Sequence, residues 1–377
     1  MANKFVSAYA SGAFNGSDEA HPWTLTQALA SAAVGDYVWI KDDRAYTTGC
    51  HWTLWVGGSY ANNTHIYFIG YHNSANCDFV NHISDMDYGQ PYWGGPLNPS
   101  AVNCWVDING SDTANSVLWF DSRDNVHFRN LYFHNTNRAS GNYAVYVENS
   151  KGVTFTKCKF ADSYINLYFE TCYSCLVEYC YFNDFASENF NPYTASGANH
   201  IISNCVFNGG TITIYRSSVY GSLFIGGVYG LRTYNYNNAF NNVFYGQTSY
   251  GISYGHNTFQ GGLIEHNNIF VPATKAVLGI YKAGDGSLTY SGYGCAYCLA
   301  APAGVLDVPY AGENALNVDP QFMNPAGNDF RPRNPLVLRG GKPDFAGNPA
   351  QIGAILQKYQ FANRSRAANP GRLSIFK

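Results

Sequence analysis

Three carboxylates occupy equivalent positions in a repeated part of the sequence. Asp121, Glu148 and Glu170 each follow an aromatic residue by two positions. Two carboxyl groups on one surface can act as the acid and the base, or as the acid and the nucleophile, of glycoside hydrolysis. Three of them on adjacent strands repel one another unless water, a cation or a substrate offsets the repulsion. The sequence therefore marks these residues as candidate catalytic groups.

A row of aromatic residues accompanies the carboxylates. Each member lies fourteen residues before a second aromatic, which closes a short apolar segment. Aromatic faces stack on the apolar faces of sugar rings, so an outward-facing row predicts a glycan-binding strip. The alternative is a ladder of rings that only stabilises a sheet. The row consists of Trp119, Tyr146, Tyr168, Tyr193 and Tyr215.

One short apolar segment recurs along the chain and ends each time in an aromatic residue, here called the closing aromatic. Its period of roughly 20 to 30 residues is typical of a solenoid, in which each repeat stacks only on its neighbours. Alternation inside each copy has a period of two, so the stacked unit is a strand. Looser copies end at Tyr229, Phe244 and Phe270. The clear copies span residues 126–133, 153–160, 177–182 and 202–207.

Strand alternation also predicts which way these residues face. The positions on either side of the aromatic row are apolar, as Leu118 and Phe120 are beside Trp119. Neighbouring residues of a strand point to opposite faces of a sheet, so the apolar flanks fill the core. The aromatic row and the three carboxylates are therefore expected on the outer surface.

A capping pattern precedes the first strand. Apolar residues from Leu25 onward share one helical face, Thr24 is a suitable N-cap, and Gly35 ends the helix. The run 23–41 resembles the opening cap of right-handed parallel β-helix proteins, and parts of 317–354 resemble their closing segment. That superfamily includes pectate-lyase-like enzymes and phage tailspikes.

The resemblance implies an all-β fold. We expect a single right-handed parallel β-helix solenoid of about ten coils, with a short N-terminal capping helix and an irregular C-terminal segment. Residues 1–36 are the expected lead-in and capping helix, residues 37–300 the β-helix, and residues 301–377 the closing segment and a basic tail. Such a tail is either solvated or an anchoring peptide for an acidic partner.

The cysteines indicate packing and not disulfides. Cys158, Cys180 and Cys205 each lie two residues before a closing aromatic, which predicts a buried ladder of small side chains. A candidate second ladder consists of Cys50, Cys77 and Cys104.

Two further cysteine pairs have the spacing of zinc ligands. They are Cys172 with Cys175 and Cys295 with Cys298. A zinc ion needs four ligands together, and these pairs lie far apart along a rod. Buried or turn thiols are therefore expected, and no metal.

The residue just before each closing aromatic faces outward and becomes apolar in the later copies. An apolar outer stripe must be covered, either by a neighbouring subunit or by the C-terminal segment of the same chain. The resemblance to phage β-helices favours a homotrimer. Its expected interface includes Val206, Val228, Val243 and Ile269.

Composition excludes several classes of partner. The formal net charge is −3 and only 12% of residues are charged, so no basic surface for nucleic acid is indicated. No apolar stretch is long enough for a membrane span. The N-terminus lacks the features of a secretory signal, which predicts synthesis in the cytosol without export through such a signal. No cofactor is expected, with Ca²⁺ as the alternative at the acidic positions.

Two functions remain open from the sequence. The first is a non-enzymatic decoration or spike-like protein on the surface of a virus (phage) particle, which contacts glycans and joins the virion through a terminal segment. The second is a polysaccharide hydrolase or lyase that uses Asp121, Glu148 or Glu170 as acid or base. We favour the first, because catalytic signatures of the β-helix hydrolases are missing and because assembly into a particle explains the missing export signal.

Overall fold

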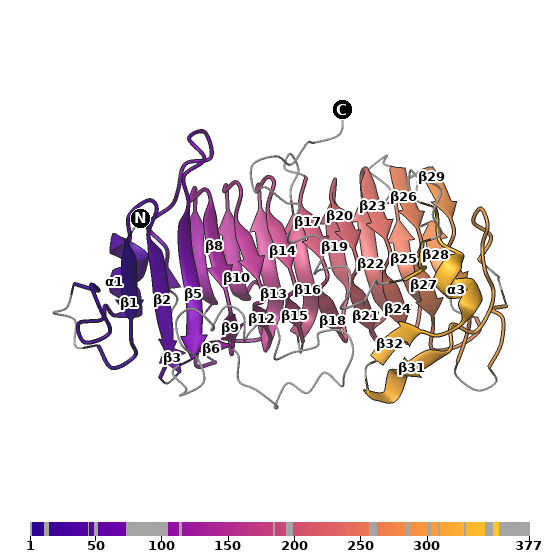
Figure 1. The fold of residues 1–377 in the computed structure, drawn as a ribbon, viewed down its shortest axis with the longest axis horizontal. Helices are drawn as coiled ribbons and strands as arrows, with labels where there is room; N and C mark the ends of the chain where they lie inside the picture. Colours follow the sequence, from indigo (N-terminus) through magenta and orange to yellow (C-terminus); the bar gives the residue numbers. More distant parts are fainter. Residues whose placement is uncertain are drawn as a thin grey trace.

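The computed structural model of the chain shows a right-handed parallel β-helix, which confirms the predicted fold class (Figure 1). Its coils advance along one axis, from the indigo N-terminal strands to the yellow C-terminal segment. The structure describes residues 2–10, 15–43, 45–48, 52–72, 105–112, 115–183, 185–193, 199–255, 262–276, 278–282, 287–299, 303–307, 310–327, 329–343 and 350–353.

Three parallel sheets, here called A, B and C, form the sides of the helix. Sheet A contains β1 (Asn3–Val6), β2 (Tyr37–Asp42), β5 (Ile66–His72), β8 (Val126–Arg129), β11 (Thr154–Thr156), β14 (Leu176–Glu178), β17 (Ile201–Ser203), β20 (Ser218–Tyr220), β23 (Asn237–Phe240), β26 (Gly262–His266) and β29 (Ser287–Gly292). Sheet B contains β3 (Tyr46–Thr47), β6 (Val106–Asn109), β9 (Leu131–His134), β12 (Lys159–Phe160), β15 (Tyr181–Phe182), β18 (Val206–Asn208), β21 (Leu223–Ile225), β24 (Val243–Tyr245), β27 (Ile269–Val271) and β30 (Cys295–Ala296). Sheet C contains β4 (Trp52–Thr53), β7 (Ser116–Asp121), β10 (Tyr143–Glu148), β13 (Ser163–Glu170), β16 (Phe185–Tyr193), β19 (Ile212–Tyr215), β22 (Tyr229–Tyr234), β25 (Tyr250–Tyr254) and β28 (Leu278–Lys282).

The corner between sheets A and B turns through a residue with a left-handed backbone. Asparagine adopts this conformation more easily than most residues, which accounts for part of the asparagine content. Lys157, Tyr179 and Tyr293 adopt it in the same place, at a conformational cost. Asparagine or glycine fills the other corners, at Asn130, Asn204, Gly221, Asn241 and Asn267.

A short helix closes the N-terminal end, as predicted. Helix α1 (Leu25–Ser31) begins after Thr24, whose hydroxyl accepts a hydrogen bond from the Gln27 backbone N–H at 3.2 Å. The Gln27 side chain accepts one from the Thr24 N–H at 2.8 Å, which completes a capping box. Leu25 and Leu29 are buried. The helix thereby covers apolar side chains at the open end of the stack.

The lead-in is more ordered than the sequence suggests. Its strand β1 pairs in parallel with β2, from Asn3 opposite Tyr37 to Val6 opposite Ile40. The first strand of sheet A therefore precedes the capping helix. Within the described ranges, no helix is long and apolar enough to cross a membrane.

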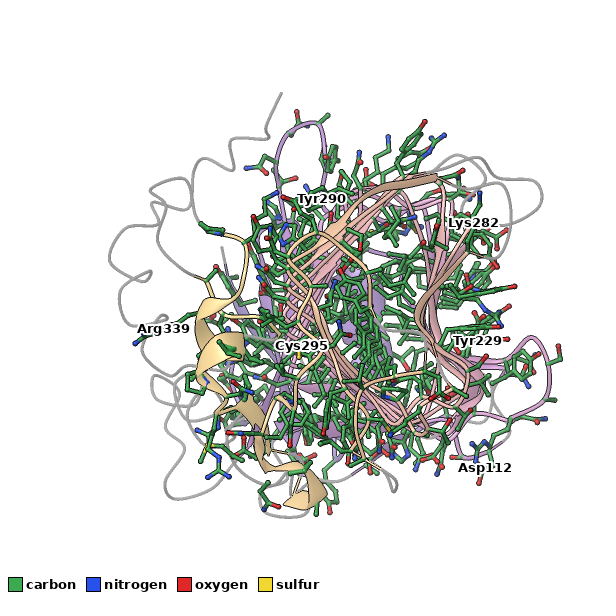
Figure 2. All side chains as sticks on the ribbon, turned by 90° about the vertical axis from the view of Figure 1, so that its right-hand side faces the viewer. Asp112, Tyr229, Lys282, Tyr290, Cys295 and Arg339 are labelled. Carbon is green, nitrogen blue, oxygen red and sulfur yellow. The ribbon has the colours of Figure 1, made fainter. Side chains whose placement is uncertain are left out.

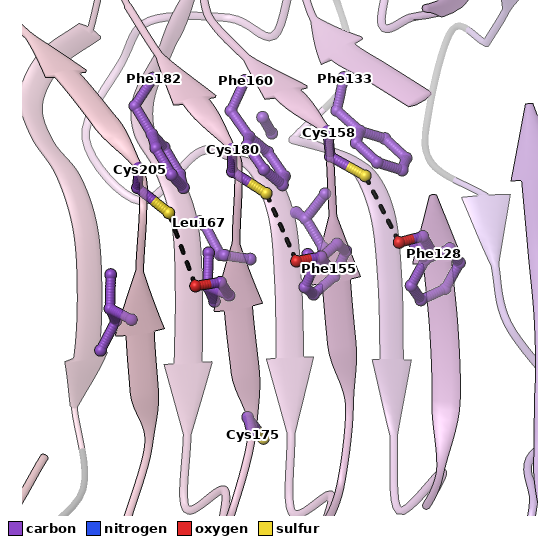
Figure 3. Close-up of a cluster of buried hydrophobic side chains, with 14 of the residues drawn as sticks. Phe128, Phe133, Phe155, Cys158, Phe160, Leu167, Cys175, Cys180, Phe182 and Cys205 are labelled. Atoms are coloured by element: carbon purple, nitrogen blue, oxygen red, sulfur yellow. Dashed lines mark hydrogen bonds between the residues drawn. The ribbon is translucent and has the colours of Figure 1, made fainter. Parts of the chain in front are cut away.

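Two columns of side chains fill the interior (Figure 3). Phenylalanines of successive coils stack with ring centroids 4.6 to 5.6 Å apart, which adds to the stabilisation from burial. Beside them, Cys158, Cys180 and Cys205 are fully buried, and each thiol donates to a backbone carbonyl at 3.4 to 3.6 Å. The predicted cysteine ladder is confirmed. The rings of the column are Phe133, Phe160, Phe182, Phe207, Phe224, Phe244 and Phe270.

This column corrects the alignment of one coil. Phe207 pairs with Phe224, and Phe224 pairs with Phe244. Phe224 and not Tyr229 is therefore the closing aromatic of this coil. The coil is shorter than its neighbours, and the aromatic at the expected spacing, Tyr229, already begins a strand of sheet C.

The cysteine pairs with zinc-like spacing are buried. Each thiol of Cys172, Cys175, Cys295 and Cys298 donates to a backbone carbonyl at 3.2 to 3.8 Å. Cys295 lies in the outer stripe of sheet B, whereas the other three lie in the interior. The two pairs occupy different coils. The second predicted ladder, Cys50, Cys77 and Cys104, lies outside the described residues, as does most of the basic tail.

The C-terminal segment covers the later half of sheet B (Figure 2). In the end-on view, the ribbon that carries Arg339 lies outside the face marked by Cys295. The segment consists of β31 (Phe322–Asn324), η1 (Pro325–Gly327), β32 (Asp329–Pro332) and α3 (Pro335–Arg339). Its Phe322, Phe330 and Val337 pack into one apolar cluster with the outer stripe of sheet B.

The predicted subunit interface is corrected by this packing. Val206, Val243 and Ile269 belong to the covered stripe and are 0% exposed, so the chain itself and not a second subunit covers them. Val228 is 52% exposed and lies before β22, outside the stripe. The sequence pattern places Val228 in the stripe because it precedes Tyr229, which is the wrong closing aromatic. In the structure, Leu223 holds the position equivalent to Val243.

His200 is a buried base in the core. It is 1% exposed, its Nδ1 accepts from the Cys175 backbone N–H at 3.3 Å, and its ring lies 5.4 Å from that of Phe169. No described group pairs with its Nε2. Burial lowers the pKa of His200 to about 4, because the charged imidazolium is poorly solvated there.

We expect His200 to make stability fall as the pH drops from about 6.5 to about 4. In this window the unfolded chain binds a proton at His200 and the folded chain does not. In His200→Asn the amide oxygen can still accept from Cys175 but cannot be protonated. Urea unfolding across this pH range should show wild type losing up to about 3 kcal/mol relative to the variant. A pH-independent difference would contradict the assignment.

Candidate functional site

The outer face of sheet C brings the three predicted carboxylates together. Asp121 pairs in register with Glu148, and Glu148 pairs with Glu170. Neighbouring parallel strands lie about 4.8 Å apart, so the three form one row across adjacent coils. Their flanking neighbours Phe120 and Val147 are fully buried, which places the carboxylates on the solvent side.

The outer two carboxylates receive hydrogen bonds and the middle one does not. Asp121 accepts from the Ser122 hydroxyl at 2.9 Å and from the Asn149 amide at 3.0 Å. Glu170 accepts from the Tyr146 hydroxyl. No described side chain donates to the carboxyl of Glu148.

Glu148 is consequently the carboxyl that best retains a proton. Its partial burial, followed by the negative charges of Asp121 and Glu170, raises its pKa above the usual range. Both causes disfavour a third charge in the row. Glu148 is therefore the member of the row whose protonated form is favoured.

The first three predicted rings lie beside this row. Trp119 pairs with Tyr146 and Tyr146 with Tyr168, two residues before the carboxylates on each strand. The rings do not form a flat ladder, because the planes of Tyr146 and Tyr168 meet at 66°.

Tyr143 is a member of this surface that the sequence pattern missed. Its ring stacks on that of Tyr168 at 4.8 Å and lies 5.0 Å from that of Tyr146. It precedes Tyr146 by three residues, and the intervening Ala144 and Val145 are both fully buried. This break in the two-residue alternation hid it, although an aromatic at the start of the same strand was a usable signal.

Tyr193 is out of register with the predicted row of rings. Tyr193 pairs with Glu170, and Asn191 stands next to Tyr168, because the pairing between β13 and β16 shifts register near Ser163. The side chain of Tyr193 lies outside the described residues.

Tyr215 is also removed from the strip. It is only 8% exposed, and its ring stacks on that of Tyr234 at 4.8 Å. Little of either face is left for a sugar, so the glycan-binding assignment of Tyr215 is corrected.

A second polar cluster follows along sheet C. Glu188 accepts from the Thr213 hydroxyl at 3.1 Å and from the Asn191 amide at 2.6 Å, and its carboxylate lies 3.7 Å from the Arg232 guanidinium. Burial raises the pKa of Glu188, while Thr213, Arg232 and Asn191 oppose the shift. Arg232 also lies over the Tyr229 ring, 4.6 Å from its centroid. The sequence pattern missed this cluster because Glu188 lies five residues before Tyr193, whereas the predicted carboxylates lie two residues after their aromatic.

Stacked tyrosines continue the outer face toward the C-terminal end. Tyr229 and Tyr250 have ring centroids 5.6 Å apart, and Tyr250 and Tyr281 4.1 Å apart. Tyr281 is 37% exposed. In Figure 2, Tyr229 and Lys282 mark this side of the helix. Sheet C therefore presents aromatic rings at both ends of its outer face.

The described residues contain no group of three or more His, Cys, Asp or Glu arranged to hold a metal ion. Asp121, Glu148 and Glu170 supply oxygen atoms of the kind that Ca²⁺ takes as ligands. The expected absence of a cofactor stays a prediction, with Ca²⁺ at this row as its alternative.

Comparisons with known proteins show similarity in fold alone. No protein family matches the sequence, and no curated protein matches it either. A crystal structure of the pectate lyase Pel9A superposes with a TM-score of 0.57 at 12% identity, over 94% of this chain and 96% of that one. A rhamnogalacturonan lyase gives 0.46 at 11% identity, over 97% and 98%. An alginate lyase from Paenibacillus sp. str. FPU-7 gives 0.44 at 10% identity, over 71% and 96%.

We expect Arg232→Met to destabilise the fold by about 1 to 2 kcal/mol, because it leaves the charge of the half-buried Glu188 without its cation. The double variant with Glu188→Gln should recover most of the loss, since an amide carries no charge. Urea denaturation measures both. Arg339→Met, on the exposed side of α3, is the matched control and should change little. Equal stability of wild type and Arg232→Met would refute the pairing.

Proposed function

We propose that this chain is a polysaccharide-degrading enzyme that works at the outer face of sheet C. The observation that carries the proposal is the in-register row of Asp121, Glu148 and Glu170 beside Trp119, Tyr146 and Tyr168. Acid-assisted glycoside cleavage requires a carboxyl that retains its proton beside a second carboxyl, and a raised pKa at Glu148 supports that role.

The fold comparison supports this function over the virion protein that the sequence favoured. The solved pectate lyase is a carbohydrate-active enzyme with the same fold along almost the whole chain. Fold alone does not assign a reaction, so the residues of the row decide the chemistry.

Glu148 is the general acid of the proposed reaction. Its carboxyl proton passes to the glycosidic oxygen while the bond from that oxygen to the anomeric carbon breaks. A carboxylate on an adjacent strand attacks the same carbon and forms a glycosyl ester. Water then cleaves the ester, and the ionised Glu148 takes the proton of that water. The strand separation of about 4.8 Å is close to the roughly 5 Å between carboxyl groups of retaining glycosidases.

The aromatic residues hold the glycan beside the carboxylates. Their rings offer apolar surface to sugar rings, and the carboxylates accept hydrogen bonds from hydroxyl groups. A non-catalytic glycan-binding protein is the second candidate, because the same surface would serve it. The two candidates differ in whether product is released.

Glu148→Gln should lower the release of reducing ends from a responsive polysaccharide by at least about a hundredfold, because the amide cannot donate the proton. Xylan, galactan, polygalacturonate and alginate form the test panel. Asp307→Asn, an exposed carboxylate on the C-terminal segment, is the control and should retain wild-type rates. Unsaturated products would show that the enzyme cleaves by elimination and not by hydrolysis. No product from any of the four would favour the binding protein.

Tyr168→Ala should weaken retention of the protein on the immobilised polysaccharide by roughly fivefold to tenfold, through loss of one stacking ring. Affinity electrophoresis measures the retention. Tyr236→Ala removes a ring that is 70% exposed and lies in the turn after β22. Retention should persist in this control. If Tyr168→Ala migrates like wild type, the rings beside the carboxylates are a structural feature only.

A further inference from the structure

One hydrogen bond joins Tyr146 to the row of carboxylates. Its hydroxyl donates to Oε2 of Glu170 on the adjacent strand. Tyr146 pairs directly with Tyr168, so Glu170 is its diagonal neighbour on the outer face. Diagonal neighbours lie within reach of a long aromatic side chain. The hydroxyl therefore bonds to the carboxylate of the next coil and not to Glu148 on its own strand.

The ring of Tyr146 is held in this orientation by its neighbours. The Tyr143 ring lies 5.0 Å from it, tilted by 42°, and the Tyr168 ring lies 5.4 Å from it, nearly perpendicular. Tyr143 and Tyr168 in turn stack on each other. Three rings thus fix one hydroxyl, which in turn fixes one carboxylate oxygen.

In the hydrogen bond between Tyr146 and Glu170, Tyr146 is the donor. Burial, followed by the bond to Glu170, raises the pKa of Tyr146, so the phenol stays protonated and can only donate to the carboxylate. A donated hydrogen bond also fixes the direction of the carboxylate that accepts it. Glu148 has no such donor from a described side chain.

We propose that Tyr146 is a positioning residue that holds the Glu170 carboxylate in a fixed orientation, which makes Glu170 the carboxylate that acts with Glu148. This inference rests on the proposed function. It replaces the stacking role first expected of Tyr146 with a role in placing the reacting oxygen. The unbonded oxygen, Oε1, is the atom left for attack on the anomeric carbon.

Tyr146→Phe tests the proposal, because it removes the hydroxyl and keeps the ring. We expect kcat to fall roughly tenfold to a hundredfold on the polysaccharide that responds in the panel, with KM changed less than about twofold. A loss confined to kcat indicates that the reacting carboxylate has lost its orientation while substrate binding is retained. A tyrosine that only stacked on the glycan would raise KM instead.

Tyr220→Phe is the matched control. It makes the same chemical change on the outer face of sheet A, where Tyr220 is 38% exposed, and should leave both kcat and KM unchanged. A second measurement needs no activity. Carbon-detected NMR of proteins with ¹³C-labelled glutamate carboxyls should show one displaced resonance in Tyr146→Phe, because one carboxylate loses a hydrogen bond. No such displacement is expected in Tyr220→Phe.

The outcomes separate the two hypotheses. An active enzyme whose kcat and carboxyl resonances are the same in wild type and Tyr146→Phe overturns the positioning role and leaves the proposed function standing. A protein that cleaves none of the four polysaccharides overturns the proposed function, and the positioning role with it, even when a carboxyl resonance is displaced. A displaced resonance together with the kcat loss supports both.

Discussion

The structure depends on the parallel register of successive coils. Each strand pairs with the equivalent strand of the next coil, so equivalent residues lie in rows about 4.8 Å apart. Inside, this spacing suits flat rings and small thiols, which gives the stacked phenylalanine column and the ladder of Cys158, Cys180 and Cys205. Outside, the same spacing forces equivalent polar residues into contact. Stacking of like with like stabilises the interior, and on the surface it concentrates charge.

The concentration of carboxylates distinguishes the outer face of sheet C from the other faces. Asp121, Glu148 and Glu170 stand in one row because three successive coils place an acidic residue two positions after an aromatic one. The row lowers its own repulsion in two ways. The outer carboxylates accept hydrogen bonds from Ser122, Asn149 and Tyr146, and Glu148 responds with a raised pKa. Further along the sheet, Glu188 has a cation instead, in Arg232. A single face thus carries both an acidic row and a compensated ion pair.

The apolar stripe on sheet B has a different outcome. The same stacking that aligns carboxylates on sheet C aligns Val206, Val243 and Ile269 on sheet B. Apolar side chains in such a row need a cover, and β31, β32 and α3 supply it from the end of the same chain. Sheet C has polar and aromatic side chains in the equivalent rows. The difference in composition between the faces explains why one is packed away and the other is available for chemistry.

The sequence by itself determined the repeat, the strand period and the inward or outward direction of residues in the regular coils, because these follow from local alternation. It thereby located Phe133 and Cys158 in the core and Asp121, Glu148 and Glu170 on one face. Only the tertiary structure decided where that alternation breaks. The buried pair Ala144 and Val145 turns Tyr143 outward, and the register shift near Ser163 moves Tyr193 beside Glu170. Whether an apolar stripe on the outside of a sheet is exposed to solvent also depends on residues far away in the chain. A repeat fixes the neighbours of a residue only while each coil keeps the same length and pairing, and irregular coils remove that information from the sequence.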